Sequence, residues 1–153
     1  MKKIVNQLEE LISPYSEKLL LPNEKYFSEK PFPEKWSRKE ELGHLIDSAH
    51  NNLRRFVVAQ YEINPKIVYD QNFWNVTFCY QHQSTQDLIA LWKLLNRQIC
   101  EVLKSTSEQN SKRLCNTGKE EPELHSIEWL AGDYVKHLLH HLHHILALNE
   151  IPY

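Results

Sequence analysis

The chain has 153 residues, the usual length of one domain and enough to bury a hydrophobic core. Its 18 basic and 20 acidic side chains give a formal net charge of −2, so no electrostatic attraction to nucleic acid is expected. Only three glycines occur and strand-like runs are scarce, which predicts an all-α fold in a single domain over residues 1–153.

The cysteines and the apolar segments indicate in which cellular compartment the protein is located. Cys79, Cys100 and Cys115 show no CxxC spacing and their number is odd, which is typical of a reducing, cytoplasmic environment. Glu9 and Glu10 interrupt the apolar segment that a signal peptide would need. No apolar run approaches the roughly 20 residues of a membrane helix, so a soluble protein with no membrane partner is predicted.

The first helix is predicted from apolar residues at three- and four-residue steps: Ile4, Leu8, Leu11 and Ile12. It either continues past Pro14 to Leu20 or ends at the proline. The following residues, 21–36, include three prolines and are predicted to form a loop whose aromatic side chains lie over the bundle.

The second helix has a clear start and stop. Ser37 is predicted to be its N-cap, with Glu40 in the capping-box position and Trp36 as a hydrophobic staple. The helix should run from Arg38 to about Ile63, because Asn64-Pro65 then stops it. Its predicted core positions are Leu42, Leu45, Ile46, Ala49, Leu53, Phe56 and Val57.

A separate polar face of the same helix carries His44, Asp47 and Asn51 at three- and four-residue steps. This face is either solvated or lines a cleft between helices, where a catalytic metal needs an open position. Arg55 continues the polar side, and its guanidinium either binds a substrate carboxylate or is solvated.

Residues 64–83 are predicted to form a connection with a short helix between Asp70 and Tyr80. The third long helix should begin near Ser84 or Thr85 and end before the polar segment 105–112. Its predicted core positions are Leu88, Leu91, Trp92, Leu95, Ile99, Val102 and Leu103. Residues 113–126 should form a turn or a small hairpin, because they contain Asn116-Thr117-Gly118 and Pro122.

The last helix should be capped by Ser126 and has an apolar stripe of Ile127, Leu130, Tyr134, Leu138, Ile145 and Leu148. Five histidines lie among these residues. His137 and His141 fall inside or beside the stripe, His140 and His144 lie at its edge, and His143 points away from it.

The four-residue spacing of His137 and His141 allows two imidazoles on adjacent turns to bind one metal ion. The same spacing also arises by chance, and half-buried histidines are commonly just hydrogen-bonded. Because two histidines do not complete a metal site, a third ligand would have to come from elsewhere in the chain.

Four long helices with long connections predict a four-helix bundle with an irregular crossover. The connection between the second and third helices is expected to cross one end of the bundle. We expect the candidate site near that end.

Three segments resemble the DinB/YfiT-like superfamily. They are W-S-x-x-E-x-L-x-H-x-x-D-S at Trp36–Ser48, the residues Tyr69, Asp70 and Trp74, and H-x-x-x-H within residues 134–145. The resemblance covers most of the chain, in the right order. It implies an up-down-down-up four-helix bundle that binds a divalent metal ion through three histidines.

Carried over position by position, the resemblance implies that the metal ligands are His44, His137 and His141, with His140 and His144 as an alternative pair on the last helix. Asp47 matches an acidic position one turn after the first ligand. The family also implies a bacterial, cytoplasmic protein that forms a homodimer.

Three imidazoles around Zn²⁺ or Ni²⁺ leave at least one coordination position open. Such a site suits both thiol activation and hydrolysis, and the resemblance implies thiol-dependent members, so the predicted function is metal-dependent transfer of a low-molecular-weight thiol, such as glutathione or an analogue, to a small-molecule substrate. A first alternative is a hydrolase that uses metal-bound hydroxide, in which Asp47 shuttles a proton. Whatever the reaction, an Asp47 that orients a ligand imidazole or is exposed to solvent is favoured over this catalytic role. A second is a non-enzymatic, stress-related protein that only holds the metal.

Overall fold

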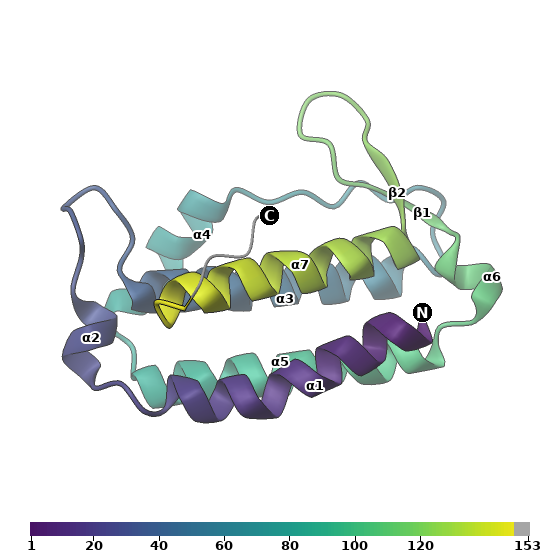
Figure 1. The fold of residues 1–153 in the computed structure, drawn as a ribbon. Helices are drawn as coiled ribbons and strands as arrows, with labels where there is room; N and C mark the ends of the chain where they lie inside the picture. The colour runs from purple at the N-terminus through teal and green to yellow at the C-terminus, as the bar shows by residue number, and fades with distance from the viewer. Residues whose placement is uncertain (149–153) are drawn as a thin grey trace.

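The computed structural model describes residues 1–148 and confirms an all-α architecture built on four long helices (Figure 1). These are α1 (Lys2–Leu19), α3 (Arg38–Val58), α5 (Thr85–Ser105) and α7 (Ile127–Ile145). The connections contain α2 (Glu24–Ser28), α4 (Gln71–Phe78), the 3₁₀ helix η1 (Tyr80–His82), α6 (Glu108–Ser111), β1 (Leu114–Asn116) and β2 (Leu124–Ser126). Within residues 1–148, no helix is both long and apolar enough to cross a membrane.

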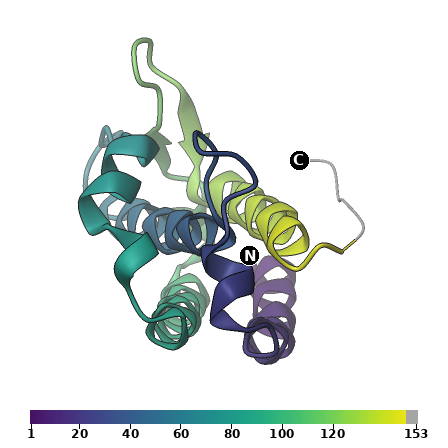
Figure 2. The ribbon, with the colours of Figure 1, turned by 90° about the vertical axis from the view of Figure 1, so that its left-hand side faces the viewer.

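The four long helices form a closed ring of neighbours. α3 packs against α5 and α7, and α1 packs against the same two helices, so α1 and α3 lie on a diagonal (Figure 2). α1 and α7 run in one direction along the bundle, and α3 and α5 run in the other (Figure 1). This is the up-down-down-up arrangement that the resemblance implies.

Since α3 and α5 are parallel neighbours, the chain between them has to return along the whole bundle. The segment after α3 therefore runs back beside that helix, and the prediction that it crosses one end is wrong (Figure 1). Arg55 holds this segment, because its Nε and Nη2 atoms donate to the Ile67 carbonyl at 3.2 and 3.1 Å. α4 then rests on the start of α3, where Asn75 Nδ2 donates to the Glu40 carbonyl at 2.7 Å.

The start of α3 is the predicted capping box. Ser37 Oγ accepts from the Glu40 N–H at 3.1 Å, and the Ser37 N–H donates to Glu40 Oε2 at 2.7 Å. The helix ends at Val58, earlier than the predicted Ile63, because the N–H groups of Gln60 and Tyr61 bond back three residues and tighten the last turn. Asn64 then adopts a left-handed φ of 47°.

Local signals explain the other element boundaries. Ser126 caps α7 as predicted, and Ser84 caps α5 at its predicted start; each hydroxyl accepts from the N–H group three residues later. α1 continues through Pro14 to Leu19. α2 lies inside the predicted proline-rich loop, where Asn23 caps it by accepting from the Tyr26 N–H at 3.0 Å. The predicted hairpin is present as antiparallel β1 and β2.

The core lies between the four helices, and its largest fully buried side chains include Trp92, Tyr134, Phe27 and Phe56. Three predicted core positions are wrong: Val57, Leu91 and Leu148 are 41%, 40% and 39% exposed. Val57 lies in the last turn of α3 and Leu91 at the margin of the buried face of α5. Leu148 lies beyond the end of α7, after a left-handed Ala147, and no longer follows the helical phase.

Candidate metal centre

The polar face of α3 is buried. His44, Asp47 and Asn51 are only 3%, 0% and 4% exposed, so the interpretation of this face as solvated is wrong. α7 and η1 both pack against α3. Gly43 permits the approach of η1, because a Cβ at this position would lie 2.1 Å from Cδ2 of Tyr80.

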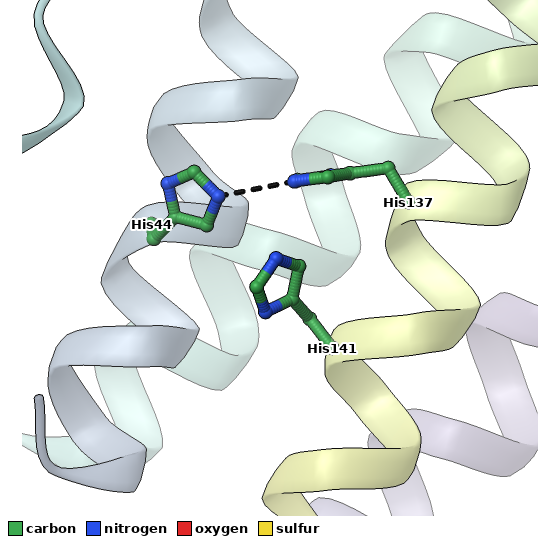
Figure 3. Close-up of side chains that lie close together, drawn as sticks. All are labelled: His44, His137 and His141. Carbon is green, nitrogen blue, oxygen red and sulfur yellow. Dashed lines mark hydrogen bonds between the residues drawn. The ribbon is translucent and has the colours of Figure 1, made fainter. Parts of the chain in front are cut away.

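His44, His137 and His141 converge between α3 and α7 (Figure 3). One ligand atom from each side chain lies within 4.8 Å of the other two. The Nε2 atoms of His44 and His137 face each other at 3.1 Å, close to the roughly 3.3 Å expected between two nitrogens at ~2.05 Å from one tetrahedral zinc ion. The His141 ring centroid lies 4.9 Å from that of His44 and 4.5 Å from that of His137.

The environment keeps two of these imidazoles neutral. Burial lowers the pKa of His44 to about 4, and the neighbouring charge of His141 contributes in the same direction. Burial also lowers the pKa of His137 to about 3, with His141 and His44 adding to the effect. At neutral pH both rings are therefore unprotonated, the form in which histidine binds a metal ion.

Glu41 orients the third histidine and was not identified from the sequence. Its Oε1 lies 2.7 Å from His141 Nδ1, and its Oε2 lies 2.6 Å from His144 Nδ1. Burial favours the protonated acid, but the hydrogen bonds from His141 and His144 outweigh it and hold the pKa of Glu41 below its ordinary value. With Nδ1 bound to a carboxylate, His141 has Nε2 left as its metal-binding atom, as in many histidine metal sites.

The Nδ1 atoms of His137 and His44 have different hydrogen-bond surroundings. His137 Nδ1 lies 3.5 Å from Ser48 Oγ, a hydroxyl that also receives a hydrogen bond from Asn52 Nδ2 at 3.3 Å. His44 Nδ1 is buried without a hydrogen-bond partner among residues 1–148. The donor set fits a divalent metal, because it offers three converging imidazoles, two of them neutral and one oriented by a carboxylate.

Asp47 lies outside the three-histidine group. It accepts a hydrogen bond from the Tyr80 hydroxyl through Oδ1, whereas its Oδ2 is buried without a partner among residues 1–148. Burial raises the pKa of this carboxyl to about 6, although the Tyr80 hydrogen bond opposes the shift. The role of Asp47 as a proton shuttle or ligand-orienting group stays a prediction.

The remaining histidines of α7 have other surroundings. His143 Nε2 lies 2.7 Å from the Tyr15 hydroxyl on α1. His144 is 64% exposed at its side chain and contacts Glu41. His140 is half-buried, with its ring centroid 5.1 Å from that of His141. Within residues 1–148, the structure thus gathers His137 and His141 with His44, and not the alternative pair.

A cleft of about 550 Å³ opens beside the centre. Its walls come from the loop before α3, from α3 itself, and from the facing ends of α4 and α7: Pro31, Phe32, Glu34, Lys35, Trp36, Glu41, Asn72 and His144. Trp36 and Glu41 join the cleft to the centre, since the Trp36 ring lies 5.2 Å from the His44 ring and Glu41 contacts His141. The cleft therefore lies next to the centre, although none of the three histidines is among its lining residues.

The family profile of the DinB superfamily matches residues 7–145. YfiT of Bacillus subtilis (strain 168), classed as a probable metal-dependent hydrolase, is 29% identical over 119 residues. That match covers 75% of this chain and only 65% of the length of YfiT.

Two solved structures share the fold. YfiT from Bacillus subtilis, described as having an unusual four-helix bundle topology, superposes with a TM-score of 0.86 at 24% identity, over 95% of this chain and 83% of that one. A mycothiol-dependent maleylpyruvate isomerase superposes with a TM-score of 0.72 at 16% identity, over 98% of this chain and 61% of that one.

Proposed function

Since this chain belongs to the DinB superfamily, we propose that His44, His137 and His141 bind one divalent metal ion, Zn²⁺ or Ni²⁺, and that the protein transfers a low-molecular-weight thiol to a small-molecule substrate. The observation that carries the proposal is the convergence of three histidine nitrogens from two helices within 4.8 Å. When bound, such an ion supplies a Lewis acid that lowers the pKa of a thiol or of a water molecule.

The protein contributes a neutral ligand set. Imidazoles that bind a metal ion do so in their unprotonated form and do not compensate the charge of a divalent cation, so an anionic partner such as a thiolate is favoured at an open position. The carboxylate of Glu41 lies outside this set and binds His141 and His144. Its role is to hold the His141 ring in one tautomer and one orientation.

Hydrolysis is the second candidate, supported by the likeness to YfiT. It requires a group beside the three histidines that accepts a proton from water. Asp47, the residue considered for this step, is fully buried and hydrogen-bonded to Tyr80. This contact and the fold shared with a thiol-dependent isomerase favour thiol transfer.

Metal content tests the ligand set. Untagged wild-type protein should contain about one zinc or nickel ion per chain by elemental analysis, and His44→Ala should lose it. His143→Ala is the matched control, because His143 contacts Tyr15 away from the centre. Absence of metal from the wild type after incubation with Zn²⁺ and with Ni²⁺ would refute the proposal.

Activity separates the two chemistries. The metal-loaded wild type should conjugate glutathione or cysteine to 1-chloro-2,4-dinitrobenzene, and His44→Ala should not. Hydrolysis of p-nitrophenyl acetate without any thiol, with no conjugation, would favour the hydrolase. A bound ion with neither reaction would support the non-enzymatic alternative.

The resemblance also leads us to propose that the protein forms a homodimer. Light scattering, which measures the molar mass in solution, tests this proposal.

A further inference from the structure

We infer that the cleft beside the centre binds the apolar ring of the substrate, so that the protein acts on small aromatic molecules with an oxygen or sulfur donor next to the ring. The inference rests on the proposed metal site, because that site receives the donor atom. It adds the class of substrate, which the three histidines alone do not define.

The first argument is the size and position of the cleft. Its volume of about 550 Å³ lies within the ~300–1,000 Å³ typical of small-molecule sites. Trp36 belongs both to its wall and to the surroundings of His44, at 5.2 Å between ring centroids. A ring that stacks on Trp36 in the cleft is therefore one side chain away from His44.

The second argument is the chemistry of the walls. Pro31, Phe32 and Trp36 contribute apolar side chains to the walls of the cleft. Phe32 is 61% exposed, which leaves a large aromatic side chain in water beside a functional site. Aromatic side chains stack on flat apolar ligands and lose contact with water when they do so.

The third argument is that the loop carrying Phe32 is held in place. The Lys35 N–H donates to the Phe32 carbonyl at 3.0 Å, which closes a turn around these residues. Before the turn, Lys30 pairs with Glu40 at 2.8 Å, and Gln81 Nε2 donates to the Ser28 carbonyl at 2.6 Å. The ring is thus presented on a fixed loop, which reduces the entropy lost on binding.

The fourth argument concerns the orientation of the ligand. Glu34 and Lys35 carry opposite charges at the cleft. The Glu41 carboxylate is already bound by two imidazoles. With a divalent ion at the centre, the strongest attraction for an anionic or electron-rich donor lies at the three histidines. The donor end of the ligand therefore points inward and the ring lies against Phe32 and Trp36.

The test compares two probes that bind a metal ion in the same way and differ in one ring: acetohydroxamic acid and benzohydroxamic acid. Zinc-loaded full-length protein is titrated with each by calorimetry, after its metal content has been measured. Benzohydroxamate should bind the wild type about tenfold more tightly, the effect of burying part of one aromatic ring. Phe32→Ala should reduce this preference to about twofold or less.

Phe73→Ala is the matched control, because Phe73 is a similarly exposed phenylalanine, at 68%, that does not line the cleft. It should leave the preference unchanged. Equal binding of the two probes by the wild type, or equal loss in both variants, would overturn the inference while leaving the metal site intact. If the zinc-loaded protein binds neither probe, the metal ion has no open coordination position. If the protein binds no zinc, it has no metal site. Either result would refute the proposed function as well.

Discussion

Along the interface between α3 and α7, the end near α4 is built from histidines and a carboxylate, whereas the opposite end is built from hydrocarbon and aromatic rings. At the first end His44, His137 and His141 converge beside Glu41. At the other end Phe56 of α3 meets Tyr134 of α7 edge to face, with ring centroids 6.4 Å apart. The same two helices thus form two different kinds of contact.

The apolar end supplies packing energy and leaves its polar atoms paired: the Tyr134 hydroxyl donates to Asn96 Oδ1 at 2.7 Å. The histidine end buries several titratable groups and leaves His44 Nδ1 without a partner among residues 1–148. The free-energy cost of removing such groups from water offsets much of the stability that their contacts contribute. We infer that the apolar end contributes most of the packing stability of this interface and that the other end carries the proposed metal site.

The largest expected effect lies at the apolar end. Phe56→Ala should lower the free energy of unfolding by about 3–5 kcal/mol, because it removes a fully buried ring from the core. Urea unfolding of the metal-free protein measures this loss. A loss below about 1 kcal/mol would contradict the assignment of this end as the stabilising one.

The next effect appears only with metal. Zinc at about a hundred times its Kd should raise the free energy of unfolding of the wild type by about 2.7 kcal/mol. His137→Ala should show no such gain, since it removes one of the three ligands. Unfolding with and without zinc measures the gain, with His143→Ala as the control that keeps it. An equal gain in both variants would remove His137 from the centre.

Asp47 tests whether a buried carboxyl near this end destabilises the fold. Its pKa is raised from 3.8 to about 6 in the folded state, so the folded protein holds the proton to higher pH than the unfolded chain does. Stability contributed by the protonated form is present below about pH 4 and is lost as the pH rises through about 6.

Asp47→Asn removes this titration. Relative to the wild type, the variant should gain about 1–3 kcal/mol between about pH 4 and neutral pH. Urea unfolding of both metal-free proteins at the two pH values measures the difference. A difference that is independent of pH would show that the pKa of Asp47 is the same in the folded and the unfolded state.

A substitution of Glu41 tests the zinc affinity of the histidine end. Glu41→Gln keeps the shape of the side chain and removes the charge that orients His141, so zinc affinity should fall about tenfold to a hundredfold. Competition with a zinc chelator measures the affinity. Glu40→Gln is a neighbouring control, because Glu40 binds Lys30 and the Ser37 N–H. Equal losses in both variants would assign the effect to α3 as a whole.

The smallest expected effect is at the start of α3. Ser37→Ala removes a side-chain hydrogen bond to the Glu40 N–H and should lower the free energy of unfolding by about 1 kcal/mol. Zinc affinity should stay the same if the remainder of α3 keeps its position. Urea unfolding and the chelator competition together measure both quantities.

The sequence was informative where the signal is local. The capping serines are followed at once by their helices, and the spacing of His137 and His141 places both on one face of α7. His44 as their partner came from the family resemblance. Its burial was not predictable, because it depends on α7 and on Gly43, which lets Tyr80 approach α3.

Other features depend on contacts between distant parts of the chain. Glu41 lies one helical turn before His44, but its partner His141 is 100 residues away, and the motif treats position 41 as variable. The path of the chain after α3 follows from the parallel packing of α3 and α5, which no short segment encodes. The short helix α2 has an N-cap residue, Asn23, that is visible in the sequence. The prolines around it nevertheless led to the prediction of a loop.

His44 and His137 are separated by 93 residues of chain, so the centre closes a loop that contains most of the protein. Long loops close late in folding, because their entropy is lost before their contacts form. α7, which carries two of the three histidines, is synthesised after α1, α3 and α5. A nascent chain that ends before residue 127 carries His44 without its partners, so metal uptake at the proposed centre has to follow the synthesis and docking of α7.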